Sequence, residues 1–199
     1  MTFAGTPASP ALLAAIRPIG LAAEAAMHAA TGGVNTHKGA IFAFGLIAAA
    51  LGRRLAAQGT ATLAEVQDDV RAISAGLLAE LQQSGGDSAG KRGYARYGIS
   101  GARGEAAGGY ATVTRHALPA YRQALATDGN SRRALHLALV TLYAVNDDSN
   151  TLARVGLDGL RTHQEWAKRL LADEATLMDE NRLSAAIAAY NYDCTARRL

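Results

Sequence analysis

The sequence predicts an all-α protein, and three observations point to this fold class. Hydrophobic residues make up 49% of the 199 residues. Only 6% are aromatic, while alanine and leucine are frequent, which favours helices packed closely on helices. Apolar residues recur at helical spacing, and we find no alternating β pattern of any length. We therefore expect one domain over residues 1–199, a multi-helix bundle around a central apolar helix.

The first two helices are expected over residues 10–30 and 36–57. Pro18 should break or kink the first helix, because proline removes a backbone hydrogen bond. The second helix contains the most apolar run of the chain, 12 residues at positions 40–51. A membrane span needs about 20 residues, so we interpret this run as a buried central helix.

The other elements follow from caps and glycines. Thr62 should begin a third helix, because Glu65 completes a capping-box pattern, and this helix should end near residue 83. Residues 84–104 hold seven glycines and four cations, which predicts a long irregular segment that is either functional or disordered. A further helix is expected from residue 105 or 109 to 125, disturbed by Pro119, and another from residue 130 or 131 to 145. The last helices are expected over residues 152–160, 162–171 and from 173 onward.

Charge and cysteine content limit the classes of partner. A net charge of +3 is too small an excess to indicate nucleic-acid binding. Cys194 is the one cysteine, so an internal disulfide is excluded, and a reducing compartment fits. No basic stretch precedes an apolar run at the N-terminus. We expect a cytoplasmic protein without a nucleic-acid or membrane partner.

The most informative stretch is Gly-Gly-Val-Asn-Thr-His-Lys-Gly at positions 32–39, between two apolar helical runs. A helix N-terminus with unpaired N–H groups suits a phosphate, and glycines let the backbone approach a ligand. The spacing is not that of a Walker loop. The alternative is a glycine turn with a capping residue, although cations in the first turn oppose the helix dipole unless an anion binds there. The candidate binding residues are Gly32, Gly33, Asn35, Thr36, His37 and Lys38.

Two further polar clusters interrupt the apolar pattern. In Gly-Ala-Arg-Gly-Glu, Arg103 and Glu105 stand two residues apart at a glycine-flanked helix start; the alternative is a surface ion pair. In Asn-Asp-Asp-Ser-Asn, the adjacent carboxylates of Asp147 and Asp148 suit Mg²⁺, which prefers oxygen ligands. The alternative for this second cluster is a turn that caps the next helix.

With these clusters in hand, the chain resembles the triphosphoribosyl-dephospho-CoA synthase family over about residues 16–150. The similarity is carried, in the same order, by Ile-Gly-Leu-Ala-Ala-Glu at 19–24, Thr-Gly-Gly-Val-Asn-Thr-His-Lys-Gly at 31–39, Gly-Ala-Arg-Gly-Glu-Ala at 101–106 and Asp-Ser-Asn-Thr-Leu at 148–152. The resemblance implies an all-α pentosyltransferase. Such an enzyme moves the triphosphoribosyl group of ATP to the 2′-hydroxyl of 3′-dephospho-CoA and releases adenine. The product is the prosthetic-group precursor of citrate lyase and malonate decarboxylase.

This reaction suggests what the three clusters do. The bond from ribose to adenine breaks, so positive charge develops on the sugar, while the triphosphate must be held by cations and Mg²⁺. Besides the cluster at 32–38, Arg103 and Asn150 are expected to bind the nucleotide. Asp147 and Asp148 are expected to hold Mg²⁺, because adjacent acids at a helix start repel each other unless a cation is present.

The carboxylate that acts on the sugar or on the acceptor hydroxyl stays open among several residues. We favour Glu105, because a glycine on its N-terminal side leaves room for a sugar. Glu24 is a second catalytic candidate; it also stands four residues before His28, so a structural contact on one helix face is the alternative.

Two departures from the family pattern keep other functions open. We expect a member shortened at its N-terminus and divergent at its C-terminus, where Ala-Ala-Ile-Ala-Ala-Tyr follows Leu183 and Ser184 in place of the family's glycines and acid. One alternative is therefore a catalytically inactive nucleotide-binding paralogue. Another is a helical interaction protein without a ligand. A homodimer is also open.

Overall fold

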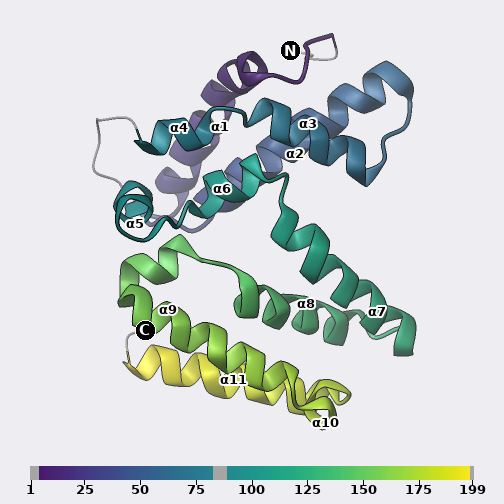
Figure 1. Ribbon diagram of the computed structural model, residues 1–199, viewed down its shortest axis with the longest axis vertical. Coiled ribbons are helices and arrows are strands. Elements are labelled where there is room, and N and C mark those ends of the chain that lie inside the picture. Colours follow the sequence, from purple (N-terminus) through teal and green to yellow (C-terminus); the bar gives the residue numbers. More distant parts are fainter. Residues whose placement is uncertain (1–4, 83–88, 198–199) are drawn as a thin grey trace. The chain divides into compact units, whose positions relative to one another are not determined.

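The computed structural model describes residues 5–82 and 89–197, and every regular element within them is helical (Figure 1). The predicted all-α class is therefore confirmed. The chain forms two compact units. Unit 1 comprises residues 1–85 and 102–110, and unit 2 comprises residues 86–101 and 111–199. The single domain over the whole chain stays a prediction.

Unit 1 begins with two helices of 21 residues each, joined by a short connection. Proline is well tolerated in the first helical turn, and Pro10 begins the first helix. This helix continues through Pro18, where a break or kink was expected. The helices of this unit are α1 (Pro10–Ala30), α2 (Lys38–Gln58), α3 (Leu63–Ile73), α4 (Leu77–Gln82) and α6 (Gly101–Ala107), of which Gly101 itself belongs to unit 2.

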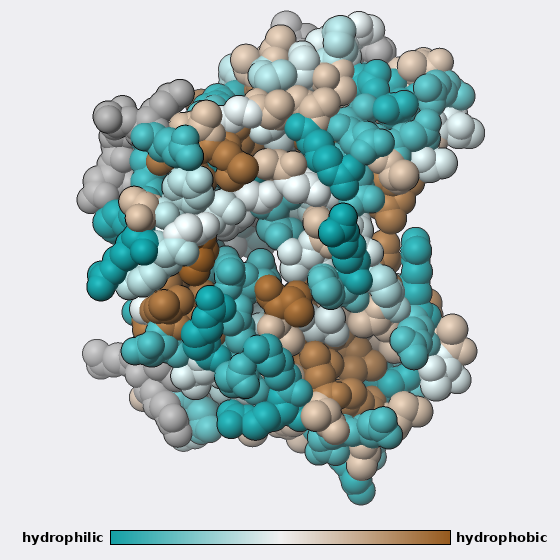
Figure 2. All heavy atoms as spheres, viewed as in Figure 1, coloured by the Kyte–Doolittle hydropathy of each residue, from teal (hydrophilic) through white to brown (hydrophobic). Residues whose placement is uncertain are grey.

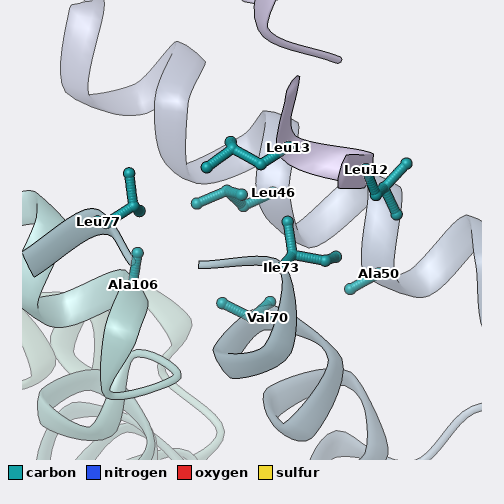
Figure 3. Packing of buried hydrophobic residues seen from close by; sticks show 8 residues of the cluster. All are labelled: Leu12, Leu13, Leu46, Ala50, Val70, Ile73, Leu77 and Ala106. Carbon is teal, nitrogen blue, oxygen red and sulfur yellow. The ribbon is translucent and has the colours of Figure 1, made fainter. Parts of the chain in front are cut away.

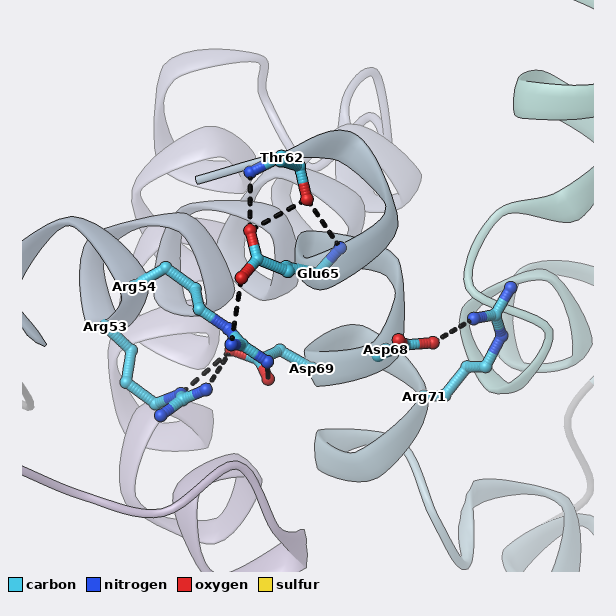
Figure 4. Close-up of polar contacts among 7 residues, drawn as sticks. All are labelled: Arg53, Arg54, Thr62, Glu65, Asp68, Asp69 and Arg71. Carbon is cyan, nitrogen blue, oxygen red and sulfur yellow. Dashed lines mark hydrogen bonds and ion pairs between the residues drawn. The ribbon is translucent and has the colours of Figure 1, made fainter. Parts of the chain in front are cut away.

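Local sequence signals account for the ends of α2 and α3. Gly59 ends α2 in the left-handed conformation, with φ 73°. The predicted capping box at Thr62 is confirmed: its hydroxyl accepts from the N–H of Glu65, whose carboxylate accepts from the N–H of Thr62 (Figure 4). One helix was predicted from 62 to 83, but Gly76, with φ 97°, separates α3 from α4.

The ends of α2 and α3 are joined by a buried ion pair. Asp69 on α3 accepts hydrogen bonds from both Arg53 and Arg54 on α2 (Figure 4). Asp69 is 3% exposed, and a buried carboxylate is tolerated only when it is paired and hydrogen-bonded. This contact holds the C-terminal half of α2 against α3.

The core of unit 1 lies where α1, α2, α3, α4 and α6 converge (Figure 3). Its buried side chains are Leu12, Leu13, Leu46, Ala50, Val70, Ile73, Leu77 and Ala106. From α2 only Leu46 and Ala50 are buried, and Phe44 is 70% exposed. The expectation that residues 40–51 form a surrounded central helix is therefore wrong. The segment is apolar, but an apolar composition does not tell which sides of a helix are covered by other helices.

Unit 2 is built mainly from four helices that lie side by side, α7, α8, α9 and α11 (Figure 1). Leu137 and Val140 of α8 are buried in this unit, with Ala167 of α9 and Leu183 of α11. The elements are α5 (Ala89–Tyr97), the π-helical turn η1 (Val113–Ala117), α7 (Leu118–Asp128), α8 (Ser131–Val145), α9 (Ser149–Leu171), α10 (Glu174–Leu177) and α11 (Glu180–Arg197).

Several expected boundaries in unit 2 differ from the structure. Residues 89–97 are helical although an irregular segment was predicted over 84–104, of which 84–88 lie outside the described residues. Gly93 explains the difference: a Cβ there would lie 2.9 Å from Leu152 Cδ2, so the glycine serves packing rather than irregularity. The helix predicted from 105 or 109 to 125 is interrupted at Tyr110, with φ 56°, between α6 and η1. The α8 prediction is confirmed, with Asn130 as its N-cap.

Candidate active site

A pocket of about 330 Å³ lies in unit 1, lined by residues of α1, α2, α4 and α6. Most of its wall is apolar, which is typical of small-molecule sites that add a few placed polar groups. The apolar wall includes Leu13, Ile16, Ile41, Phe42, Leu46 and Leu77. The charged side chains of the lining are Arg17, Glu24, Lys38, Glu80 and Arg103.

An ion pair between Glu24 and Lys38 joins two of the predicted site residues at this pocket. Lys38 Nζ lies 3.0 Å from Glu24 Oε2. The Glu24 side chain is 19% exposed and that of Lys38 is 59% exposed, so the acid is the more enclosed partner. Lys38 is the first residue of α2, where a cation opposes the helix dipole, and the carboxylate of α1 offsets that conflict. The predicted conflict is therefore relieved within the protein itself.

A second charged group of the lining centres on Glu80 of α4. Arg17 Nη2 lies 2.7 Å from Glu80 Oε1, and Arg103 Nη2 lies 4.0 Å from Glu80 Oε2. Two guanidinium groups thus face one carboxylate at the pocket. Sequence reasoning found Arg103 but missed Arg17 and Glu80. These two stand singly on their helices, 63 positions apart, and no local spacing connects them.

The connection between α1 and α2 was predicted to form a phosphate cradle. Gly32 and Gly33 are both left-handed, with φ 62° and 87°, which favours glycine at both positions. The Gly33 N–H donates to His28 O, and the Val34 N–H donates to Thr31 O. The connection is therefore bonded to the C-terminal end of α1.

The remaining predicted cradle residues also have partners, either in the connection itself or on α1. The His37 N–H contacts Met27 Sδ at 3.0 Å, and the Lys38 N–H donates to Asn35 Oδ1 at 3.1 Å. Asn35, rather than Thr36, thus supplies the side-chain acceptor at the start of α2. Thr36 Oγ1 lies 2.8 Å from His37 Nδ1. Of the six predicted residues of this cluster, Lys38 lines the pocket, together with the next residue, Gly39.

Glu105 lies on α6 in unit 1, outside the pocket lining. Its neighbour is Tyr110, whose N–H donates to the Glu105 carbonyl oxygen at 2.7 Å. Burial, and secondly the charge of the Glu105 carboxylate, raise the pKa of the Tyr110 hydroxyl to about 12. Glu24, and not Glu105, is therefore the predicted catalytic carboxylate that the structure brings to the pocket.

The third predicted cluster lies in unit 2, at the start of α9. Asp148 is the N-cap of α9, and its Oδ1 accepts from the N–H groups of Asn150 and Thr151 at 2.7 and 2.6 Å. Asp147 Oδ1 accepts from Arg161 Nη1 at 3.0 Å and from Gln164 Nε2 at 3.1 Å. The capping alternative thus describes Asp148.

Carboxylate oxygens are the donors that Mg²⁺ prefers, so the residue types at Asp147 and Asp148 fit this ion, with one oxygen of each committed to the protein. Across residues 5–82 and 89–197, no group of three or more His, Cys, Asp or Glu side chains is placed to hold a metal ion. The metal role of the two aspartates stays a prediction.

The second and third sequence motifs meet within unit 2. A Cβ at Gly101 would lie 2.5 Å from Ser149 Oγ, and the φ of Gly101 is 53°. A side chain at this position would therefore both collide and strain the backbone. Because Gly101 has no side chain, the start of the Gly-Ala-Arg-Gly-Glu motif can pack directly on Ser149 of the Asp-Ser-Asn motif.

The fold and the pocket define a class, an all-α protein with a largely apolar small-molecule pocket ringed by paired acids and bases. Comparison with known proteins assigns the family. The model of the family described as ATP:dephospho-CoA triphosphoribosyl transferase matches residues 2–199. The chain therefore belongs to the ATP:dephospho-CoA triphosphoribosyl transferase family.

Curated relatives carry names that agree with this family. A protein named 2-(5''-triphosphoribosyl)-3'-dephosphocoenzyme-A synthase from Pectobacterium atrosepticum is 45% identical over 182 residues, 90% of this chain and 60% of the relative. A synthase of the same name from Klebsiella pneumoniae is 43% identical over 171 residues, 84% of this chain and 57% of the relative. The chain thus spans about three fifths of the length of these relatives. No solved structure matches.

Proposed function

We propose that this protein transfers the triphosphoribosyl group of ATP to the 2′-hydroxyl of 3′-dephospho-CoA and releases adenine. The family assignment and the names of the relatives support this reaction. The observation that carries the proposal is the Glu24–Lys38 ion pair in an apolar pocket. It unites a carboxylate and a cation from two of the sequence motifs that carry the family resemblance. The product would serve as the prosthetic-group precursor of citrate lyase or malonate decarboxylase.

The pocket offers two kinds of contact that suit a nucleotide. Its apolar wall favours the adenine ring and the ribose, since aromatic and aliphatic side chains line it. Lys38, Arg17 and Arg103 can turn from their carboxylate partners to the triphosphate, because their side chains are 59%, 48% and 36% exposed. Charge-assisted contacts of this kind bind phosphate strongly.

Glu24 is the residue we assign to the reacting centre. As the bond from C1′ to adenine breaks, a carboxylate beside the sugar stabilises the positive charge that develops there. The same carboxylate can accept the proton of the 2′-hydroxyl as its oxygen forms the new bond to C1′. Adenine leaves with the bonding electron pair and takes up one proton, so that the reaction balances. Glu105 is the second candidate for this catalytic carboxylate, and its substitution by glutamine tests it.

Mg²⁺ is proposed to enter with ATP and to neutralise triphosphate charge when bound. Asp148→Asn tests the proposed role of the aspartates, because asparagine caps a helix as well as aspartate does but carries no charge. A higher Mg²⁺ requirement for ATP binding in this variant would support Asp148 as a ligand. An unchanged Mg²⁺ response would leave Asp148 as a cap.

The deciding experiment is adenine release from ATP in the presence of 3′-dephospho-CoA, followed by chromatography. The parent chain should release adenine only when the acceptor is present. Glu24→Gln should lower the rate by roughly 10²–10⁴-fold with little change in ATP affinity, since it removes a proton acceptor and a charge at the sugar. No release by the parent, with ATP binding intact, would assign the inactive nucleotide-binding paralogue instead.

Lys38→Ala tests the anion site independently of turnover. Loss of a charge-assisted phosphate contact costs about 1.5–3 kcal/mol, so ATP should bind roughly 10- to 150-fold more weakly in calorimetry. Lys168→Ala is the matched control, because this lysine is paired with Glu165 on the exposed surface of unit 2. Equal ATP affinity in Lys38→Ala and in the parent would remove Lys38 from the site.

A further inference from the structure

Large hydrophobic side chains reach the surface of both units (Figure 2). Three of them, Phe44, Leu51 and Leu55, belong to α2. Phe44, Leu51 and Leu55 are 70%, 38% and 45% exposed, and Ala48 between them is also exposed. These residues follow one another at intervals of four, three and four positions. That is the spacing with which a helix presents a narrow apolar stripe to a partner helix. We call Phe44, Ala48, Leu51 and Leu55 the outer stripe of α2.

The outer stripe lies apart from the core and from the pocket. At 100° per residue, its members lie on the side of α2 opposite Leu46 and Ala50, which are buried in unit 1. None of its residues belongs to the pocket lining. Only 11% of the most apolar window of α2 is buried. A helix that is apolar on all sides normally has a partner on each of them.

We propose that the outer stripe is the interface through which two copies of this chain form a homodimer. Two α2 helices that cross antiparallel about a two-fold axis near the middle of the stripe place Leu51 of each copy against Ala48 of the other. The same axis places Phe44 against Leu55. A large side chain then faces a small one at the centre, which is the self-complementarity that a two-fold interface requires.

Charge supports a second copy as the occupant. From residue 39 to residue 52 the sequence contains no charged side chain, so two copies of the stripe bring no like charges together. The charges at the ends of α2 are already paired within unit 1: Lys38 with Glu24, and both Arg53 and Arg54 with Asp69.

A membrane is the competing occupant, since α1 and α2 are long and apolar enough to cross one by length and composition alone. The ion pairs argue against it for α2, because both ends of the helix are tied to charged residues of unit 1. Insertion of α2 into a bilayer would break these pairs and uncover Asp69, which is buried.

The size of the stripe limits the strength of the dimer. The stripe runs from Phe44 to Leu55 of α2, which is about 18 Å of helix roughly 10 Å wide, so its footprint is about 180 Å² per copy. Standard stable interfaces bury about 800 Å² per partner. We therefore expect a weak, reversible dimer that forms only as the protein concentration rises.

Sedimentation velocity over a concentration range from about 1 to about 200 µM tests the interface. The parent should pass from monomer to dimer as its concentration rises. Leu51→Glu and Ala48→Glu, each of which puts a charge at the centre of the stripe, should stay monomeric across the range. Leu63→Glu is the matched control: Leu63 is 46% exposed on α3, outside the stripe, and this variant should dimerise like the parent.

Circular dichroism keeps the result interpretable, because both stripe variants change exposed positions and should keep the helix content of the parent. A parent that is monomeric at every concentration overturns the proposal, as does a dimer that survives in both stripe variants. Flotation of the parent with vesicles of neutral and anionic phospholipid, lost in Leu51→Glu, overturns it in favour of a membrane surface. None of these outcomes depends on adenine release, so the proposed reaction is tested separately.

Discussion

Asp69 shows how one residue can fix the relation of two helices. It is 3% exposed and accepts from both Arg53 and Arg54. Removing one partner of a buried pair leaves the other charges unmatched, so Asp69→Asn should lower the free energy of unfolding by about 3 kcal/mol in urea titrations. Asp68→Asn is the control, because its carboxylate is 70% exposed and pairs with Arg71 at the surface. That change should cost less than about 1 kcal/mol, and equal losses in the two variants would contradict the buried-pair account.

The same carboxylate gives a prediction for pH. Burial alone would raise the pKa of Asp69, but the hydrogen bonds from Arg54 and Arg53 outweigh it and hold the pKa below its usual value. A carboxyl whose pKa is depressed on folding stabilises the folded state above its unfolded pKa of about 3.9, and this stabilisation is lost as the pH falls through the folded pKa. The difference in unfolding free energy between the parent and Asp69→Asn should therefore be full at neutral pH and shrink below about pH 4. A difference that stayed constant down to acid pH would contradict this reading.

At the scale of the element, Gly156 lets α9 change direction within its length. Its φ of 71° and ψ of −175° fall in a region that essentially only glycine occupies. Gly156→Ala should therefore destabilise the protein by about 2–3 kcal/mol, although open space surrounds the position. Gly129→Ala is the comparison, since Gly129 ends α7 in the ordinary left-handed region, with φ 71° and ψ 3°. That variant should lose only about 1 kcal/mol in the same urea titration. A smaller loss for Gly156→Ala than for Gly129→Ala would refute this account of the bend.

The elements also show what the sequence could and could not predict. Helix ends with a chemical signal, such as the Thr62 capping box, Gly59 and the Asn130 cap, were predicted within a residue or two. The helix α5 was missed, because glycines that serve close packing look the same in a sequence as glycines that serve a loop. The exposure of α2 was missed because an apolar helix can be surrounded or can keep a side for a partner.

The candidate site was predictable to the extent that its residues share a motif. Glu24, Lys38 and Arg103 were found from their sequence context, and the structure brings all three to one pocket. Arg17 and Glu80 were not found, because their pairing depends on how α1 packs against α4. The metal role of Asp147 and Asp148 rests on residue type alone, since helix capping uses the same carboxylates for another purpose.

At the scale of the whole molecule, the chain path ties the two units together. The chain passes between them at 85–86, 101–102 and 110–111, so each unit is built from two separate segments. Ala106, from the short inserted segment, is buried in the core of unit 1 with residues of α1 and α2. Because the segments of the two units alternate along the chain, unfolding of one unit also releases the chain ends that hold a segment of the other unit in place. We expect a single cooperative transition in which both units unfold together.

Trp166 makes this expectation measurable, because it is the one tryptophan of the sequence and lies on α9 in unit 2. Its fluorescence reports unit 2, whereas far-UV circular dichroism reports the helices of both units. The two signals should give the same midpoint in urea. ATP at 100 times its Kd should stabilise unit 1, where the pocket lies, by about 2.7 kcal/mol, and the Trp166 transition should shift by the same amount. In Lys38→Ala the shift at that ATP concentration should be smaller. Separate midpoints, or an ATP shift seen by circular dichroism but not by Trp166, would mean that the units unfold independently despite their shared chain path.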